Sequence, residues 1–161
     1  MCKFYTIFAI LFLTACTITY DRAIQTHKLV TIPLELTTHL GEKHDFVRGD
    51  EMQFLLSLGS DAYIYMYYID AEKNIIQILP SENQPSNHYS SGYFLTLPEY
   101  KDGYRFIVSE PFGKEDIWVI ASDQSMDIDM SNKSIEEIKQ KIKKHSKREY
   151  GEYVFSILTM P

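Results

Sequence analysis

The segment 62–69, AYIYMYYI, is apolar on both of its sides, and this limits the folds open to the chain. In an extended strand, alternate residues face opposite sides. One face then carries Tyr63, Tyr65, Tyr67 and Ile69, and the other carries Ile64, Met66 and Tyr68. A strand of this kind needs cover on both sides, which predicts a layered structure around it.

Further short apolar runs recur at regular spacing and are separated by turn residues. They predict strands at residues 29–37, 52–58, 62–69, 75–79, 93–97, 104–108, 117–121 and 153–158. The polar segments 39–51 and 80–92 are interpreted as loops. Because short turns flank 62–69, we expect it to be the middle strand of a meander with 52–58 and 75–79.

One helix is predicted before the last strand. Ser134 and Glu137 have the spacing of a capping box, and isoleucines follow at helical spacing at positions 135, 138 and 142. Lysines crowd the second half, where they suit the helix dipole, and Tyr150-Gly151 is expected to end the helix. The predicted fold class is mainly β: an antiparallel β-sandwich with one amphipathic C-terminal helix before the last strand.

The first residues have the order of a bacterial secretion signal. A lysine at position 3 precedes an apolar run, 4–13, that is too short to cross a bilayer as a permanent helix. The run ends in Leu13-Thr14-Ala15-Cys16, which resembles the bacterial lipobox. The resemblance implies cleavage between Ala15 and Cys16, lipid on the Cys16 sulfur, and an acyl chain such as palmitate on the new amino terminus. An ordinary signal peptide with a chance cysteine, or an uncleaved anchor, are the alternatives.

These features predict three parts: a signal peptide at 1–15, a lipidated tether at 16–28 and a single β-rich domain at 29–161. Thr17, in place of an aspartate, favours the outer membrane, with the domain facing the periplasm. Cys2 and Cys16 are the two cysteines of the sequence, so the mature domain would have no thiol for a disulfide, nucleophile or metal site. The formal net charge of −6 argues against nucleic-acid binding.

No catalytic or metal-binding pattern is recognisable. His39 and His44 lie on a predicted loop without a third ligand nearby. The segment 127–132, DIDMSN, begins like a calcium loop but lacks its glycine and its bidentate glutamate. Nucleophile elbows and glycine-rich phosphate loops are absent from the sequence. We therefore expect no cofactor, no metal and no enzymatic activity.

The aromatic residues allow two interpretations. They could form a binding face for a protein or a sugar, with Tyr63, Tyr65, Tyr67, Tyr93 and Trp118 as its candidate residues. The tyrosines of 62–69 could instead be a core layer covered by the helix. Strands favour aromatic residues on packing grounds alone, which favours the core layer.

The order of features from 48 to 121 resembles the bacterial domain of unknown function numbered 4384. The matching residues are Gly49-Asp50, Ser60-Asp61-Ala62-Tyr63-Ile64-Tyr65, Asp70, Leu79-Pro80, Gly92, Leu97-Pro98 and Pro111-Phe112-Gly113-Lys114-Glu115. The EYKDG region and the PSENQPSN loop depart from the family's pattern. The resemblance implies a β-rich, non-catalytic module in secreted and lipid-anchored bacterial proteins, and it supplies no catalytic residues.

Together these observations predict a lipid-anchored envelope lipoprotein that acts as a protein-binding or assembly module, for example as an accessory of a secretion or cell-envelope complex. Its partners would be the membrane, through Cys16, and an envelope protein. The alternative is a periplasmic hydrolase or glycan-binding protein acting on cell-wall material.

Overall fold

The computed structural model describes residues 32–126, 133–145 and 149–161. The predicted signal peptide and tether, and the calcium-like segment, lie outside these residues. The elements in chain order are β1 (Leu34–Thr38), β2 (Asp45–Val47), β3 (Glu51–Met52), β4 (Phe54–Leu58), β5 (Ala62–Ile69), β6 (Ile75–Leu79), β7 (His88–Tyr89), β8 (Phe94–Leu97), η1 (Tyr100–Asp102), β9 (Phe106–Ile107), β10 (Lys114–Ser122), α1 (Ile135–His145) and β11 (Tyr150–Met160).

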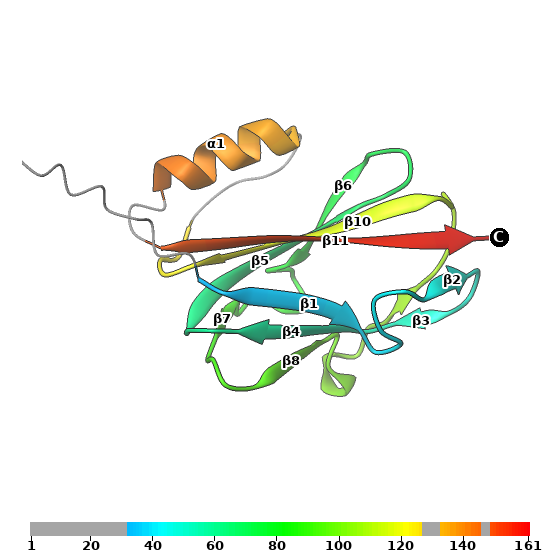
Figure 1. Ribbon diagram of the computed structural model, residues 1–161, viewed down its shortest axis with the longest axis horizontal. Coiled ribbons are helices and arrows are strands. Elements are labelled where there is room, and N and C mark those ends of the chain that lie inside the picture. The colour runs from blue at the N-terminus through cyan, green and yellow to red at the C-terminus, as the bar shows by residue number, and fades with distance from the viewer. Residues whose placement is uncertain (1–31, 127–132, 146–148) are drawn as a thin grey trace, which may run out of the picture.

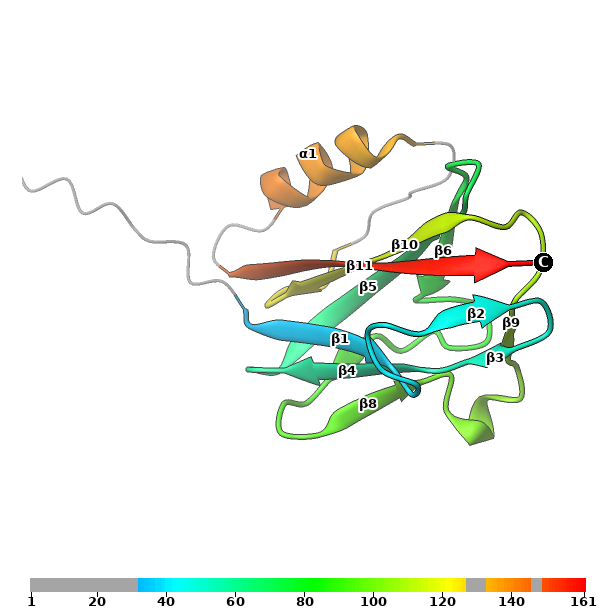
Figure 2. The ribbon, with the colours of Figure 1, turned by 45° about the vertical axis from the view of Figure 1, so that its right-hand side comes forward.

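Two sheets and a helix form the layers (Figure 1). The larger sheet has the order β2-β11-β10-β5-β6, with β7 also paired to β5. The smaller sheet has the order β1-β4-β8, and a two-stranded ribbon, β3-β9, lies near the carboxyl end of β11 (Figure 2). Helix α1 covers the outer face of the larger sheet. The predicted fold class, a mainly β sandwich with one helix before the last strand, is confirmed.

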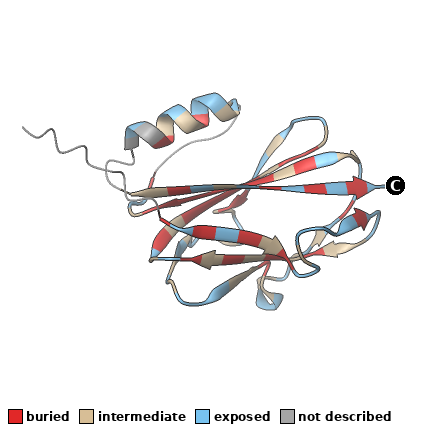
Figure 3. Cartoon of the chain, in the orientation of Figure 1, coloured by how far each residue is buried: buried red, intermediate tan, exposed pale blue. Residues whose placement is uncertain are grey.

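The core has two parts, one on each side of β5. Ile64 and Met66 point between the sheets and pack with residues of both of them. Tyr65 and Tyr67 point the other way and pack with Ile138 and other residues beneath α1. Burial along the strands follows this arrangement (Figure 3). The prediction that segment 62–69 needs cover on both sides is therefore confirmed, with the helix as the second cover.

The predicted meander is wrong. Strand β5 pairs with β10 and β6, while β4 lies in the smaller sheet between β1 and β8. The short turn after β4 therefore carries the chain from one sheet to the other instead of forming a hairpin. Strand β4 joins the smaller sheet because Phe54 and Leu56 are then buried against the inward face of β5.

Two local predictions also differ from the structure. Residues 45–47, predicted as loop, form β2, which pairs in parallel with the end of β11 and buries Phe46 completely. Tyr150 and Gly151, predicted to end the helix, are the first residues of β11. A Cβ at Gly151 would lie 2.1 Å from the Ile32 carbonyl oxygen, so the close approach of the chain before β1 requires glycine there.

Candidate functional site

Three of the aromatic residues proposed for a binding face are buried beneath α1. Tyr65 is 4% exposed, Tyr67 is 0% exposed and Trp118 is 1% exposed, and all three pack in the cluster that contains Ile138 and Ile142. A surface that binds a partner needs exposed side chains, so these residues do not form one. The binding-face interpretation is corrected for them, and the core-layer interpretation holds.

The hydroxyl groups of Tyr65 and Tyr67 have different surroundings beneath the helix. The Tyr65 hydroxyl accepts a hydrogen bond from the Met126 amide (2.6 Å) and donates one to the Met126 carbonyl (3.1 Å). The Tyr67 hydroxyl is buried without a hydrogen-bond partner among the described residues. Burial, followed by the nearby Tyr65, raises the pKa of Tyr67 well above its usual range.

Trp118 joins the helix to the sheet. Its indole nitrogen donates to Glu152 Oε1 (3.0 Å), and the same oxygen receives the Lys139 ammonium at 2.9 Å. The ammonium also lies 5.3 Å from the centre of the indole ring. Tyr63, at the end of the row, is half-buried with its ring 4.7 Å from that of His88. Each of these contacts holds elements of the domain together.

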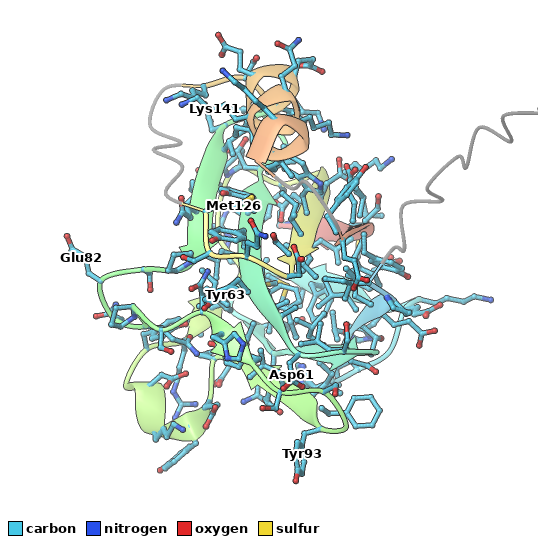
Figure 4. The ribbon with its side chains drawn as sticks, turned by 90° about the vertical axis from the view of Figure 1, so that its left-hand side faces the viewer. Asp61, Tyr63, Glu82, Tyr93, Met126 and Lys141 are labelled. Atoms are coloured by element: carbon cyan, nitrogen blue, oxygen red, sulfur yellow. The ribbon has the colours of Figure 1, made fainter. Side chains whose placement is uncertain are left out.

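Of the residues predicted for the binding face, Tyr93 is the one that is strongly exposed. Two further aromatic residues nearby in the sequence, Phe94 and Tyr100, are strongly exposed as well. Tyr93 is 78% exposed, Phe94 is 74% exposed and Tyr100 is 91% exposed. Figure 4 shows Tyr93 pointing away from the body of the molecule at the end opposite α1. Large exposed aromatic side chains are a sign of an interaction surface.

Phe94 and Tyr100 border a groove beside β8, the outer strand of the smaller sheet. The groove has a volume of about 440 Å³ and is lined by Gln53, Phe94, Leu95, Thr96, Glu99 and Tyr100. We call it the aromatic groove. It places two aromatic side chains next to the strand edge, where backbone groups can take a further hydrogen-bonding partner.

The short helix η1 presents Tyr100 to the groove. The Asp102 carboxylate accepts a hydrogen bond from the Glu99 amide (2.7 Å), and Gly103 follows in the left-handed region with φ of 72°. The Arg105 guanidinium lies 6.0 Å from the centre of the Tyr100 ring and pairs with Glu51 at 2.6 Å. These contacts fix the backbone around Tyr100 while its ring stays exposed.

The sequence predictions omit Phe94 and Tyr100. A signal for Phe94 exists in the strand pattern, because Phe94 shares its side of β8 with Thr96, whereas Leu95 and Leu97 face the core. An aromatic residue on the polar side of a strand is a sign of an exposed site. Tyr100 has no such signal, since its position depends on the turn made by η1.

A second concave feature, of about 390 Å³, lies between β6 of the larger sheet and the β3-β9 ribbon. We call it the inter-sheet cavity. Its apolar walls include Met52, Phe54, Ile76, Ile78, Phe106 and Ile107. Among its polar lining residues are Tyr68, Asp70 and Glu115, and the last two are carboxylates whose residues are 5% and 1% exposed.

The two carboxylates have different surroundings. Asp70 accepts hydrogen bonds from the Asn74 amide (2.8 Å) and the Asn74 side chain (2.7 Å), which close the turn between β5 and β6. Burial opposes ionisation of Asp70, but these bonds, with those from the Glu72 and Lys73 amides, leave its pKa below the usual value. Glu115 Oε1 accepts a hydrogen bond from the Thr159 hydroxyl (2.8 Å).

The two loop histidines considered as metal ligands each contact another group of the domain. His39 Nδ1 accepts a hydrogen bond from the Gln53 amide (3.2 Å), and His44 packs edge-on against Phe46. No group of three histidine, cysteine, aspartate or glutamate residues suited to a metal occurs among the described residues.

Ala15 and Cys16, the predicted cleavage and lipidation residues, lie outside the described residues. Within residues 32–126, 133–145 and 149–161, no helix is both long and apolar enough to span a bilayer.

Comparison with known families identifies the chain. The model of a family described as a domain of unknown function (DUF4384) matches residues 45–125, which extend from β2 through the whole of β10 and include both the aromatic groove and the inter-sheet cavity. Comparisons with curated proteins and with solved structures find no significant match. Because the family match covers half of the sequence, this chain belongs to the DUF4384 domain family.

Proposed function

We propose that this protein is a lipid-anchored, non-catalytic envelope module that binds an extended segment of a partner protein in the aromatic groove. The observation that carries the proposal is that Phe94 and Tyr100, each more than 70% exposed, both line the groove beside the outer strand β8. The partner we propose is a protein of the cell envelope.

The edge of β8 and the aromatic rings beside it both favour an extended peptide segment as the ligand of the groove. An outer strand offers unpaired backbone N–H and C=O groups, to which an added strand can bind whatever its sequence. The aromatic rings add contact area at a small cost in side-chain entropy, and aromatic residues are enriched at the energetic centres of protein interfaces. A segment that pairs with β8 would have its side chains against Phe94 and Tyr100.

The membrane anchor in the proposal is the lipid on Cys16. Support comes from the order of the first residues: a positive charge, a short apolar run and the Leu13-Thr14-Ala15-Cys16 sequence. Residues 16–28 would separate the domain from the lipid surface. Thr17 supports the outer membrane, and we place the domain on the periplasmic side.

Anchoring is tested with Cys16→Ser in cells supplied with radiolabelled palmitate. We expect the unchanged chain to incorporate label and to sediment with membranes, because two or more acyl chains give stable anchoring. The Cys16→Ser chain should incorporate none and should leave the membrane fraction or retain its signal. Equal labelling of the two chains would contradict lipidation at Cys16.

The groove is tested with the double variant Phe94→Ser/Tyr100→Ser. An envelope protein that is isolated with the unchanged chain after mild crosslinking should be lost from this variant. Val154→Ser is the matched control, because Val154 is also an exposed apolar residue, at 53%, but belongs to the larger sheet. If the control loses the partner as well, or the double variant keeps it, the groove is not the binding site.

The alternative of a cell-wall hydrolase or glycan-binding protein has less support. A glycosidase usually works with two carboxyl groups, one of them free to donate a proton. In the inter-sheet cavity, Asp70 is occupied by the hydrogen bonds of its turn and Glu110 by its ion pair with Arg48, which leaves Glu115. The buried position of Trp118 also removes the only tryptophan of the sequence from any sugar-binding surface.

A further inference from the structure

The inter-sheet cavity contains a carboxylate whose hydrogen-bonding capacity is incomplete. Glu115 is 1% exposed, and its Oε2 has no hydrogen-bond partner among the described residues. Its Oε1 is held by the Thr159 hydroxyl, which also contacts the backbone at Gly113. The position of Glu115 is therefore fixed by β10 and β11, while one of its oxygens lacks a donor.

A buried carboxylate oxygen without a donor costs free energy, and an incoming donor would recover part of that cost. Tyr68 lies close enough for Glu115 to affect it. Burial first, then a weak side-chain hydrogen bond with Glu115, raises the pKa of the Tyr68 hydroxyl. That contact does not reach the distance and angle of a well-formed hydrogen bond to Oε2. A cationic donor would satisfy this oxygen better than the tyrosine does.

The other charges around the cavity are already compensated. Arg105 pairs with Glu51 at 2.6 Å, and Glu110 pairs with Arg48 at 2.7 Å. Asp70 is occupied by its turn. Glu115 is thus the lining carboxylate without a matching cation or a full set of donors, and this gives the cavity a preference for positive charge.

The walls determine what kind of cation fits. Ile76, Ile78 and Phe106 line the cavity together with other apolar side chains, and its volume of about 390 Å³ is large enough for a small organic molecule. Ile76 and Ile107, both more than half exposed, extend the apolar surface outward. An inorganic cation would leave these walls unused, whereas an ammonium group on a short alkyl chain would contact both them and Glu115.

We propose that the inter-sheet cavity binds a primary ammonium group on a short alkyl chain, with Glu115 Oε2 as its acceptor. Such a group occurs in free alkylamines and in the side chain of lysine, so the ligand is either a small amine or a lysine of another protein. This site is separate from the aromatic groove and does not depend on the function proposed for it.

The test uses the full chain with isotope-labelled isoleucine methyl groups and three probes of equal length: n-butylammonium, 1-butanol and butyrate. We expect n-butylammonium to shift the methyl signals of Ile76, Ile78 and Ile107 saturably. Ile138 and Ile142, packed beneath α1, serve as internal controls and should not shift. Binding of 1-butanol should be weaker by about tenfold or more, since it lacks the charge-assisted hydrogen bond. Butyrate should not bind.

Glu115→Gln is the matched variant, because its side-chain oxygen can still accept from Thr159 while the charge is lost. The affinity for n-butylammonium should fall by about tenfold or more, to that of 1-butanol. Unchanged signals of Ile138 and Ile142 would show that the variant is folded. Equal binding of ammonium and alcohol by the unchanged chain would overturn the proposal, as would no binding, and neither result needs the variant.

A second pair of probes distinguishes the two sources of the ammonium. Nα-acetyl-lysine methylamide has a free side-chain ammonium between blocked ends, and its Nε-acetylated form lacks the charge. Binding of the first at least as tight as that of n-butylammonium, and loss on acetylation, would assign the site to a lysine side chain. Weaker binding than n-butylammonium would assign it to a free amine. Binding of the acetylated form with equal affinity would overturn the role of Glu115.

Discussion

Tyr65 and Tyr67 are two residues apart on one face of β5, yet their hydroxyl groups differ. The Tyr65 hydroxyl makes two hydrogen bonds to the backbone of Met126, whereas that of Tyr67 is buried without a partner among the described residues. Burial of an unpaired hydroxyl costs free energy, and loss of a paired one leaves its partners unsatisfied. Identical residues on one face therefore contribute differently to stability.

The substitution Tyr65→Phe should lower the free energy of unfolding by about 1–3 kcal/mol, because the Met126 amide and carbonyl lose their partner in a buried site. Tyr67→Phe is the matched control. It should change the free energy of unfolding by less than about 0.5 kcal/mol or raise it. Urea denaturation of the two variants measures both values. Equal losses would show that the Tyr67 hydroxyl has a partner after all.

At the scale of elements, a capping box and a narrow apolar side hold α1 in place. Ser134 and Glu137 form the predicted capping box, with the Ser134 amide donating to Glu137 Oε2 (2.9 Å) and the Glu137 amide donating to Ser134 Oγ (3.3 Å). Ile138 and Ile142, 0% and 2% exposed, anchor the helix on Tyr65, Tyr67 and Trp118. The stability of the helix thus depends on one narrow apolar side.

Replacement of Ile138 by alanine should lower the free energy of unfolding by about 2–5 kcal/mol, since it leaves a cavity under the helix. Gln140→Ala, on the exposed side of the same helix, should change it by less than about 0.5 kcal/mol. Thermal unfolding followed by Trp118 fluorescence reports on the region directly. A small effect of Ile138→Ala would show that α1 contributes little to the fold.

The turn between β5 and β6 makes stability depend on pH through Asp70. Its pKa in the folded chain is below the usual value of 3.8, so the ionised form stabilises the fold at pH above about 4. That contribution is lost as the pH falls through the lowered pKa. Asp70→Asn should therefore cost about 1–2 kcal/mol near pH 7 and progressively less below pH 4. Urea unfolding at a series of pH values tests this, and a constant difference would contradict it.

Local sequence patterns predicted most of the elements. Strand β5 has the predicted limits, 62–69, because its apolar run is bounded by turn residues on both sides. The capping box of Ser134 and Glu137 predicted the start of α1, because its two hydrogen bonds depend only on residues three apart in the sequence. Strand β2 was missed because its partner, β11, is remote in sequence, and only Phe46 of its three residues is buried. The meander was wrong because turn length alone does not decide which sheet a strand joins.

On the scale of the whole molecule, each layer has a different role. Helix α1 closes the outer face of the larger sheet and converts the tyrosine row of β5 into core. The smaller sheet ends at β8, where Tyr93, Phe94 and Tyr100 remain exposed. The exposed Tyr93 therefore lies at the end of the molecule opposite the helix (Figure 4).

The sequence predicted little of the two candidate sites. Tyr93 was among its candidates, but Tyr65, Tyr67 and Trp118 were as well, and composition cannot distinguish exposed from buried aromatic residues. The inter-sheet cavity depends on contacts between β6, β9 and β10, which no local pattern shows. Glu115 appeared only as the last residue of a Pro-Phe-Gly-Lys-Glu turn. Its burial emerges when β10 pairs with β11.

The most direct test of the account is site-specific photocrosslinking of the full chain in living cells. A benzophenone amino acid replaces Tyr100, which borders the aromatic groove, or Val154, which is exposed on the larger sheet. We predict a discrete adduct with an envelope protein from position 100, its loss on addition of Phe94→Ser, and no such adduct from position 154. The same adduct from both positions, or an adduct at 100 that persists with Phe94→Ser, would contradict the proposal that the groove binds the partner.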